Sequence, residues 1–307
     1  MTNRKLYIIG NGFDLQHGMK SKYSDFREYL IKIDENLVEN LEKYFGYESL
    51  WSEFEETLSE LDTERIKDEC MVYFVQYGAD NWSESANHDY QYEIEKRIDI
   101  ILRILKNEFR EWILQLEIPE ISYKKVVDID KNAVFINFNY TTTLEDIYKV
   151  SEKNIFYIHN KAIDCKSVLV LGHCINQQNV NELRGYNYDE DIDIRLIEGD
   201  QILNKYFKDT YKSTQTIIDE NIVFFNSLIS IENIYVFGHS LSNVDKPYFE
   251  HIVKKISRDT VIWNVSINNT IDLENHKIFF EQLGIKSELI NYNRISEFDS
   301  RQLRIFN

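Results

Sequence analysis

The chain has 307 residues, of which 43% are hydrophobic and 14% aromatic. This composition can supply a sizeable folded core and excludes a disordered chain, while only 10 glycines and 2 prolines exclude collagen-like and linker-rich architectures. The net charge of −17 argues against a protein whose main task is to coat nucleic acid or an anionic membrane.

The cysteines and the N-terminus indicate the compartment. Cys70, Cys165 and Cys174 are odd in number and show no C-x-x-C spacing, which argues against a disulfide framework or a structural zinc site and favours a reducing cytosol. The first apolar run stops at Gly10, far short of a signal-peptide core. No run of apolar residues is long enough for a membrane span. We therefore expect a cytoplasmic protein that has no membrane partner.

Seven short apolar runs predict buried strands. Most are nearly continuous in apolar residues rather than alternating, which is typical of strands buried on both faces of a parallel sheet. In chain order the runs are residues 5–9, 133–136, 154–158, 167–171, 234–237, 261–265 and, more weakly, 287–292.

The segment between the first two strands has a helical pattern. Apolar residues recur every three or four positions from Phe26 onward, with Ser24 as a candidate N-cap, and the longest helix is predicted over 88–116, before Pro119. The residues expected to be buried there are Trp51, Phe54, Leu58, Ile98, Leu105, Phe109 and Trp112.

The fold class follows from this order of strands and helices. We predict an α/β fold with a doubly wound, mostly parallel sheet and a large helical insertion. Residues 1–27 and 121–307 form the predicted nucleotide-binding α/β domain, and residues 28–120 form the insertion. The insertion is expected to pack against the sheet domain or against a second subunit, which would make a homo-oligomer.

A glycine-containing loop follows the first strand. Gly10, Asn11, Gly12, Phe13 and Asp14 combine a tight turn with a following helix N-terminus, an arrangement that lets the backbone approach a phosphate. The position of the third glycine of the dehydrogenase fingerprint is occupied by a leucine, which disfavours hydride transfer. We favour a nucleotide-binding loop over a plain turn, and expect Gly12→Val to abolish binding while largely preserving the fold.

Polar residues also follow the next two strands. Asn139 and Tyr140 come directly after the second predicted strand, where an amide can cap the next helix, hold a ribose or position a water. His159 ends the third strand and is either a structural histidine or a proton acceptor. Parallel strands bring their carboxyl ends to one edge, so we expect Asn139 and His159 to lie there together, facing the Gly10–Asp14 loop.

A further polar turn follows a late strand. Gly238, His239, Ser240 and Asp245 fit a ribose- or phosphate-binding turn better than a nucleophile elbow, because Ser242 replaces the second glycine of G-x-S-x-G. An additional Gly-His pair stands at 172–173. The spacing of the histidines matches no helix-borne zinc motif, so no metal is expected.

These motifs together resemble the bacterial abortive-infection AbiH family. The resemblance rests on the motifs in the same order along nearly the whole chain: Leu6 to Leu15, His17-Gly18, Tyr23 to Phe26, Trp51 to Glu55, Phe138 to Thr141, Ile158-His159, Leu171 to His173 and Gly238 to Leu241. It implies an antiviral role, in which an infected cell stops supporting phage growth, with a phage-derived trigger.

The chain is also distantly similar to sirtuin-like NAD-consuming domains, which have a Rossmann-like sheet. By that likeness Asn139 and His159 occupy the positions of the catalytic Asn and His. Thr141 stands where many such defence domains carry Asp, Asn160 stands in place of a Gly, and the four-Cys zinc module is absent. The likeness therefore implies NAD hydrolysis rather than lysine deacylation, with NAD as substrate and no cofactor.

Three functions are compared at this point. The preferred hypothesis is an NAD glycohydrolase in which the Gly10–Asp14 loop holds the pyrophosphate, Asn139 and His159 act on the ribose and water, and His239, Ser240 and Asp245 hold the remaining ribose. The alternatives are a nuclease or RNA-directed toxin, disfavoured by the negative charge, and a non-catalytic nucleotide-binding sensor.

Overall fold

The computed structural model describes residues 4–119, 126–175 and 193–298. The chain divides into two compact units, an α/β unit and a helical unit. The α/β unit consists of Met1–Lys22, Arg110–Val170 and Ser213–Asn307, and the helical unit consists of Tyr23–Phe109 and Leu171–Lys212.

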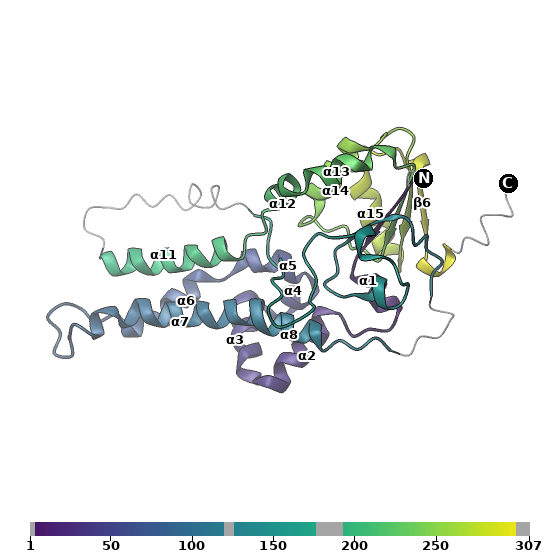
Figure 1. The fold of residues 1–307 in the computed structure, drawn as a ribbon. Helices are drawn as coiled ribbons and strands as arrows, with labels where there is room; N and C mark the ends of the chain where they lie inside the picture. Colours follow the sequence, from purple (N-terminus) through teal and green to yellow (C-terminus); the bar gives the residue numbers. More distant parts are fainter. Residues whose placement is uncertain (1–3, 120–125, 176–192, 299–307) are drawn as a thin grey trace, which may run out of the picture. The chain divides into compact units, whose positions relative to one another are not determined.

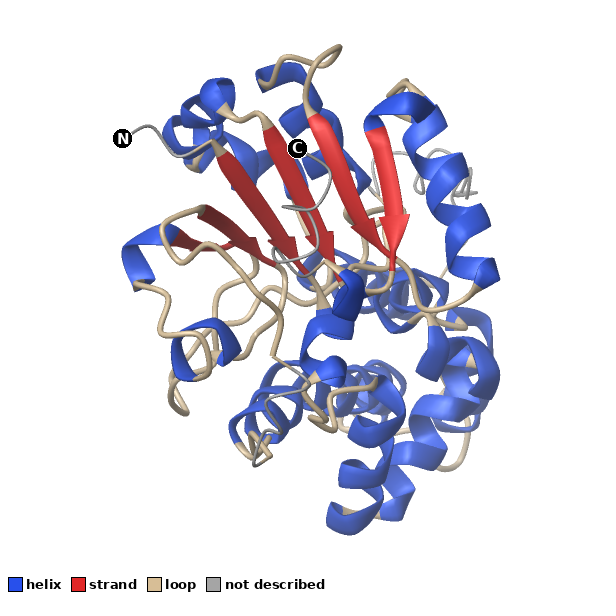
Figure 2. Ribbon diagram, turned by 90° about the vertical axis from the view of Figure 1, so that its right-hand side faces the viewer, coloured by secondary structure: helices blue, strands red, loops and turns tan. Residues whose placement is uncertain are grey.

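The α/β unit contains a six-stranded sheet whose order is β3-β2-β1-β4-β5-β6. All neighbouring strands pair in parallel, and their arrowheads meet at one edge of the sheet (Figure 2). The order reverses direction between β1 and β4, as in a doubly wound sheet, so the predicted fold class is confirmed. The strands are β1 (Lys5–Ile9), β2 (Val134–Asn137), β3 (Ile155–Tyr157), β4 (Asn233–Phe237), β5 (Ile262–Ser266) and β6 (Ile290–Asn293).

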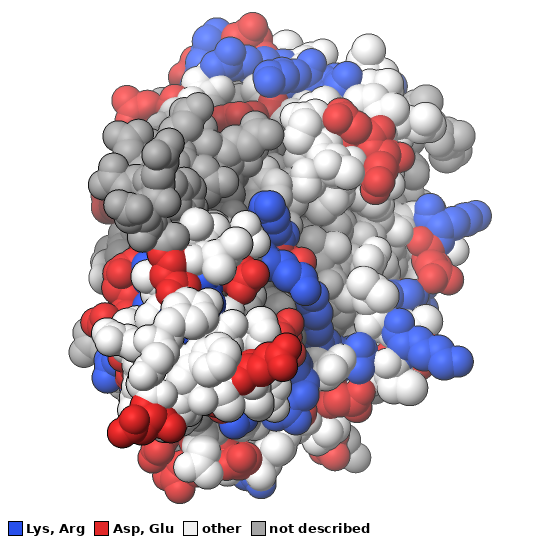
Figure 3. Space-filling model, turned by 90° about the vertical axis from the view of Figure 1, so that its left-hand side faces the viewer, with Lys and Arg blue, Asp and Glu red and all other residues white. Residues whose placement is uncertain are grey.

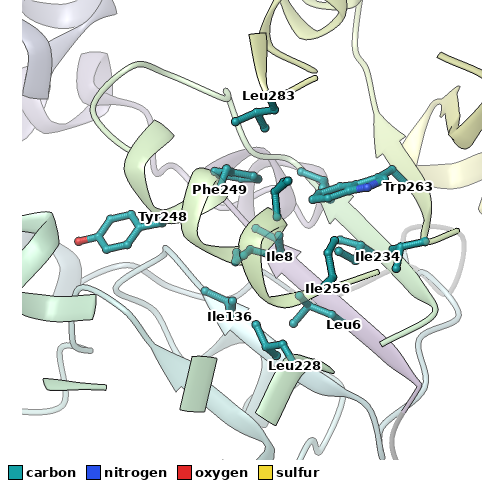
Figure 4. Close-up of a cluster of buried hydrophobic side chains, with 14 of the residues drawn as sticks. Leu6, Ile8, Ile136, Leu228, Ile234, Tyr248, Phe249, Ile256, Trp263 and Leu283 are labelled. Atoms are coloured by element: carbon teal, nitrogen blue, oxygen red, sulfur yellow. The ribbon is translucent and has the colours of Figure 1, made fainter. Parts of the chain in front are cut away.

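Strand β1 is buried on both faces because its alternate side chains enter two separate cores. Leu6 and Ile8 join the cluster drawn in Figure 4, where helix residues such as Phe249 pack on the sheet. Tyr7 and Ile9 point to the other face and join a second cluster. A strand in this position needs a nearly continuous apolar sequence, which is the pattern seen in residues 5–9.

Helices of the α/β unit begin at residues suited to helix starts. The side chain of Asn269 accepts a hydrogen bond from the Asp272 N–H and caps α15, and Pro247 stands in the first turn of α14. The helices are α1 (Asn11–Gln16), α9 (Thr143–Asp146), α12 (Thr214–Glu220), α13 (Ile222–Asn226), α14 (Lys246–Lys255) and α15 (Thr270–Gln282).

In the helical unit, α7 and α11 lie side by side (Figure 1). Gly199 of α11 permits their close approach, because a Cβ there would lie 2.8 Å from the ring of Tyr90. The helices are α2 (Tyr23–Ile33), α3 (Glu35–Phe45), α4 (Tyr47–Ser52), α5 (Phe54–Thr57), α6 (Thr63–Cys70), α7 (Asp89–Arg103) and α11 (Ile194–Asp209). A π-helical turn (Ile104–Glu108) joins α7 to α8 (Phe109–Leu114), at whose start the unit boundary falls.

The predicted helix over 88–116 is confirmed, since α7, the π-helical turn and α8 cover most of it. Ser24 is not the N-cap of α2, because that helix already begins at Tyr23. Six of the seven side chains expected to be buried are buried, and Trp51 is half-buried: the six are Phe54, Leu58, Ile98, Leu105, Phe109 and Trp112.

The predicted strand over 167–171 is wrong. This run forms no ladder, and Val168 is 77% exposed. Its polar backbone atoms bond to the turn after β3 instead: the Val170 N–H donates to the carbonyl of His159, and the Asn160 side chain donates to the carbonyl of Val168. The segment is therefore a loop that lies against that turn.

The two units also divide the chain differently from the predicted domains. Residues 171–212, expected in the α/β domain, group with the helices, because α11 packs along α7. The helical unit begins at Tyr23 and its first segment ends at Phe109, whereas 28–120 was expected. The predicted boundary at residues 120–121 lies outside the described residues.

Candidate functional site at the carboxyl edge of the sheet

The loops that follow β1 and β4 meet where the sheet reverses direction. Ile9 lies in register with Phe237 of β4, so the chain leaves both strands at the same level. The Gly10 N–H then donates to the Phe237 carbonyl at 3.0 Å, and the Gly12 N–H donates to the Gly238 carbonyl at 2.7 Å. The two loops are thus joined by backbone hydrogen bonds.

The close contact between these two segments explains why residues 10, 12 and 238 are glycine. A Cβ on Gly10 would lie 2.6 Å from the Cα of His239, and one on Gly12 would lie 2.7 Å from the Cα of Gly238. Gly238 has a φ of +66°, and a Cβ there would lie 2.1 Å from the Phe13 nitrogen. All three positions need glycine for the loops to touch. The expectation that Gly12→Val leaves the fold largely intact is therefore revised, since the side chain would push the loops apart.

The predicted Gly10–Asp14 loop is in fact the start of α1, with Gly10 at its N-cap, and it uses many of its polar groups internally. Besides the two glycine N–H groups, the Phe13 N–H donates to the Gly10 carbonyl, and the Phe13 ring is fully buried. The exposed Asn11 exchanges side-chain hydrogen bonds with Ser21, donating to its carbonyl and accepting from its hydroxyl. A ligand at this loop would meet Asn11 rather than Phe13.

Asp14 is a buried carboxylate that ties α1 to the segment after β2. Its two oxygens accept hydrogen bonds of 2.6 Å from the hydroxyls of Thr141 and Thr143. The side chain is only 1% exposed, and burial raises the pKa of Asp14 to about 6, while hydrogen bonds from Thr141, Thr143 and Asn139 oppose that rise. Sequence analysis singled out the polar run after this strand, but it named neither threonine as a site residue and did not foresee their contact with Asp14.

Asn139 bridges the β2 and β1 loops. Its side-chain amide donates to the Gly10 carbonyl at 3.1 Å, and its N–H donates to the side-chain oxygen of Asn137. The helix α9 has Thr142 at its N-cap, so Asn139 does not cap that helix. Asn139 therefore contacts Gly10, as predicted, while its predicted proximity to His159 and its role in chemistry stay predictions.

His159 and His239 converge on one carboxylate. The Nε2 atom of His159 lies 3.7 Å from Asp245 Oδ1, and the Nε2 atom of His239 lies 3.5 Å from Asp245 Oδ2. Both imidazoles are 2% exposed and pack against the ring of Phe138, which stands between β2 and Asn139. Sequence analysis placed these histidines on the same edge but did not foresee that they share Asp245.

The other predicted site residues surround this pair. The Tyr140 ring stacks at 6.2 Å from that of His159, and its hydroxyl donates to the Val170 carbonyl. Ser240 is exposed on the β4 loop. Asn160 has a φ of +63°, the left-handed conformation that Asn tolerates better than most residues. The turn after His159 therefore keeps a shape that glycine would also adopt.

The motifs that contain His17 and His173 have structural explanations. His17 donates from Nδ1 to the Phe13 carbonyl and accepts at Nε2 from the Tyr148 hydroxyl, both at 2.7 Å, so the ring fastens α1 to the segment after α9. Because Tyr148 also accepts from a backbone N–H, this direction of donation is the consistent one. His173 belongs to the helical unit, where it pairs with Tyr211, and not to the cluster at the sheet edge.

Two negative findings apply to the described residues. Within 4–119, 126–175 and 193–298, no group of three or more His, Cys, Asp or Glu side chains is arranged to hold a metal ion. None of the helices in those ranges is both long and apolar enough to cross a membrane.

The fold and the site define a class: a doubly wound α/β protein with a cluster of mostly buried polar side chains where the order of its parallel sheet reverses. The chain belongs to the family described as Bacteriophage abortive infection AbiH, which matches residues 6–267. Comparisons with curated proteins and with solved structures gave no match.

Proposed function

We propose that the chain acts in abortive infection by hydrolysing NAD or a related nucleotide at the carboxyl edge of its sheet. The observation that carries the proposal is the position of the polar cluster. Asn139, His159 and His239 follow three different strands and gather where the strand order reverses, the place at which doubly wound sheets bind nucleotides.

The reaction requires a water and a proton acceptor. In NAD hydrolysis the bond between ribose C1′ and the nicotinamide nitrogen breaks, and its electron pair neutralises the positive charge of the ring. Water adds to C1′ through an oxocarbenium-like state, as in glycoside hydrolysis, and loses one proton. The products are nicotinamide, ADP-ribose and that proton.

This chain offers a residue for each step. The Asn139 amide nitrogen is held by the Gly10 carbonyl, which leaves the side-chain oxygen to accept a hydrogen bond from the water or a ribose hydroxyl. His159, beside Asp245, takes the proton. The exposed Asn11 and Ser240 flank the line where the β1 and β4 loops meet, and they supply polar contacts for the rest of the dinucleotide.

The departures from sirtuin-like domains are compatible with this chemistry. Asn160 keeps the left-handed turn that a glycine would make after the catalytic histidine. The Thr141 hydroxyl donates to Asp14, so a carboxylate is present near this position although it comes from α1. At residues 141 and 160 the residue type therefore differs from sirtuin-like domains, while the local shape of the sheet edge is kept.

The test measures nicotinamide release by chromatography from purified protein incubated with NAD, with and without extract of phage-infected cells as a source of the trigger. Asn139→Ala and His159→Ala should each lower turnover by about 10²–10⁴-fold, the usual contribution of acid–base groups. His88→Ala, an exposed histidine of the helical unit, should leave turnover unchanged. Wild-type-level turnover in both site variants, or none in wild type under either condition, would reject the proposal.

A non-catalytic sensor is the second candidate. It is favoured by the low exposure of Asn139 and His159, 7% and 2%, together with the use of Asn139 in joining two loops. A sensor would bind NAD, measured by calorimetry, without releasing nicotinamide. A nucleic-acid-directed toxin is disfavoured by the charge: acidic side chains flank the basic ones on the face drawn in Figure 3, and the net charge is −17.

A further inference from the structure

His239 is fixed in one protonation state by its own loop. The Leu241 N–H donates to His239 Nδ1 at 2.9 Å, so that nitrogen carries a lone pair and no proton. In the neutral ring the proton is then on Nε2, the atom that faces Asp245 Oδ2. His239 can gain a second proton only by losing the hydrogen bond from Leu241.

The backbone is strained to make this hydrogen bond. Leu241 has a φ of +57°, in the left-handed region that a branched aliphatic residue rarely adopts. Its side chain is 6% exposed, so packing holds the residue in place. Strained residues that persist in this way concentrate at functional sites.

Asp245 is also used in an unusual way. It stands at the N-cap of α14, a position where Asp commonly accepts a hydrogen bond from the first turn, yet its side chain makes no such bond. The carboxylate instead lies between the Nε2 atoms of His239 and His159. The carboxylate is therefore placed to interact with both imidazoles.

We infer that Asp245 is a positioning residue for His159, and that the neutral His239 holds the Asp245 carboxylate so that, of the two imidazoles, only His159 exchanges a proton. By this inference Asp245 and His239 act on His159 and do not bind a ribose. The inference deepens the proposed function and rests on it for the identity of the reaction. The pairing of the three side chains stands on the geometry alone.

The groups that face His159 within the α/β unit come from three segments. Asp245 and Tyr248 flank the start of α14, Tyr140 follows β2, and His239 reaches Asp245 from the β4 loop. Asp245 is the carboxylate of this set. A carboxylate at this distance favours the imidazolium form of a histidine.

The first test is an NMR titration of imidazoles in ¹⁵N-histidine-labelled full-length protein. In wild type, His239 should keep the Nε2–H tautomer between about pH 5 and pH 8, while His159 titrates. Asp245→Asn should lower the midpoint of His159 by about one pH unit or more, the size expected for loss of a nearby opposite charge. Asp272→Asn, which removes a carboxylate that acts on His276 instead, should leave His159 unchanged.

An unchanged His159 midpoint in folded Asp245→Asn, or a His239 that titrates in this range or carries its proton on Nδ1, would overturn the inference. If Asp245→Asn fails to fold, His239→Gln is used in its place. It should lower the His159 midpoint, because the Asp245 carboxylate is no longer held beside His159. The second readout is the pH profile of nicotinamide release, whose acidic limb should move with the His159 midpoint. Absent turnover in wild type would reject the proposed function, whereas the NMR result would still decide the pairing.

Discussion

At the scale of single residues, the sheet edge combines buried charge with close backbone contact. Asp14 is a carboxylate in the core that accepts from Thr141 and Thr143, and Gly12 lies against Gly238. Each of these features costs stability unless its partners stay in place. Both therefore give predictions that depend on one side chain and its immediate neighbours.

Asp14 should make the protein less stable at neutral pH than in mild acid, relative to an uncharged variant. Burial raises its pKa to about 6, so between about pH 4 and pH 6 the folded state binds a proton that the unfolded chain does not. Stability from this group is gained as the pH falls through 6. Relative to Asp14→Asn, wild type should gain about 2 kcal/mol between about pH 7 and pH 4.5.

Urea unfolding of both proteins at the two pH values measures this difference. The other carboxylates are common to both proteins, so their contributions cancel in the comparison. If the two stability curves ran parallel across this range, the raised pKa of Asp14 would be refuted.

Gly12→Ala should lower the free energy of unfolding by about 3 kcal/mol, because the added Cβ overpacks the contact with Gly238. Gly78→Ala is the informative comparison: Gly78 has a φ of +84° and open space around it, so this change adds backbone strain without overpacking. It should cost about 1 kcal/mol. Chemical denaturation of both variants distinguishes the two effects, and equal losses would show that close approach is not what requires Gly12.

At the scale of elements, helix starts are set by individual caps. Asn269 accepts a hydrogen bond of 2.9 Å from the Asp272 N–H at the start of α15, a helix that places Phe279 and Phe280 in the core. Ser213 stands at the N-cap of α12 without making a side-chain cap bond. These two helices therefore differ in how much their starts depend on the cap residue.

Asn269→Ala should lower the free energy of unfolding by about 1 kcal/mol, since one N–H of the first turn loses its partner. Ser213→Ala should change it by less than about 0.5 kcal/mol. Urea midpoints of both variants against wild type provide the measurement. A larger loss in Ser213→Ala than in Asn269→Ala would contradict the assigned caps.

At the scale of the whole molecule, the excess of acidic groups opposes the compact state. The net charge is −17, and repulsion between exposed carboxylates is screened by salt over about 8 Å at physiological ionic strength. Salt screens buried ion pairs less than exposed ones. One such pair joins Lys212 to Glu55 at 2.7 Å, and the Lys212 side chain is fully buried within the helical unit. Screening should therefore weaken the repulsion more than it weakens such pairs.

The urea midpoint at constant pH should rise when sodium chloride is increased from about 10 mM to about 150 mM. Choline chloride at matched ionic strength controls for specific binding of sodium. A midpoint that falls with salt would mean that surface ion pairs outweigh the repulsion.

The amino-acid sequence by itself determined the strands of the sheet and the kind of residue at their ends. Five or so apolar residues in a row followed by a glycine or a polar residue form a local signal, and it located β1 to β5 with small errors in their ends and the weaker β6 with a larger one. The run at 167–171 carried the same signal and is a loop, because nothing within five residues tells whether a strand finds a partner. The helical pattern from Phe26 was equally local.

Only the tertiary structure decided what those residues do to one another. Asp14 and Thr141 are 127 positions apart, and their contact depends on which strand lies beside β1. The same holds for the contact between Gly12 and Gly238, for the carboxylate shared by His159 and His239, and for the grouping of 171–212 with α7. Strand order and register are set by burial summed over the whole sheet, and no spacing within one segment encodes that sum.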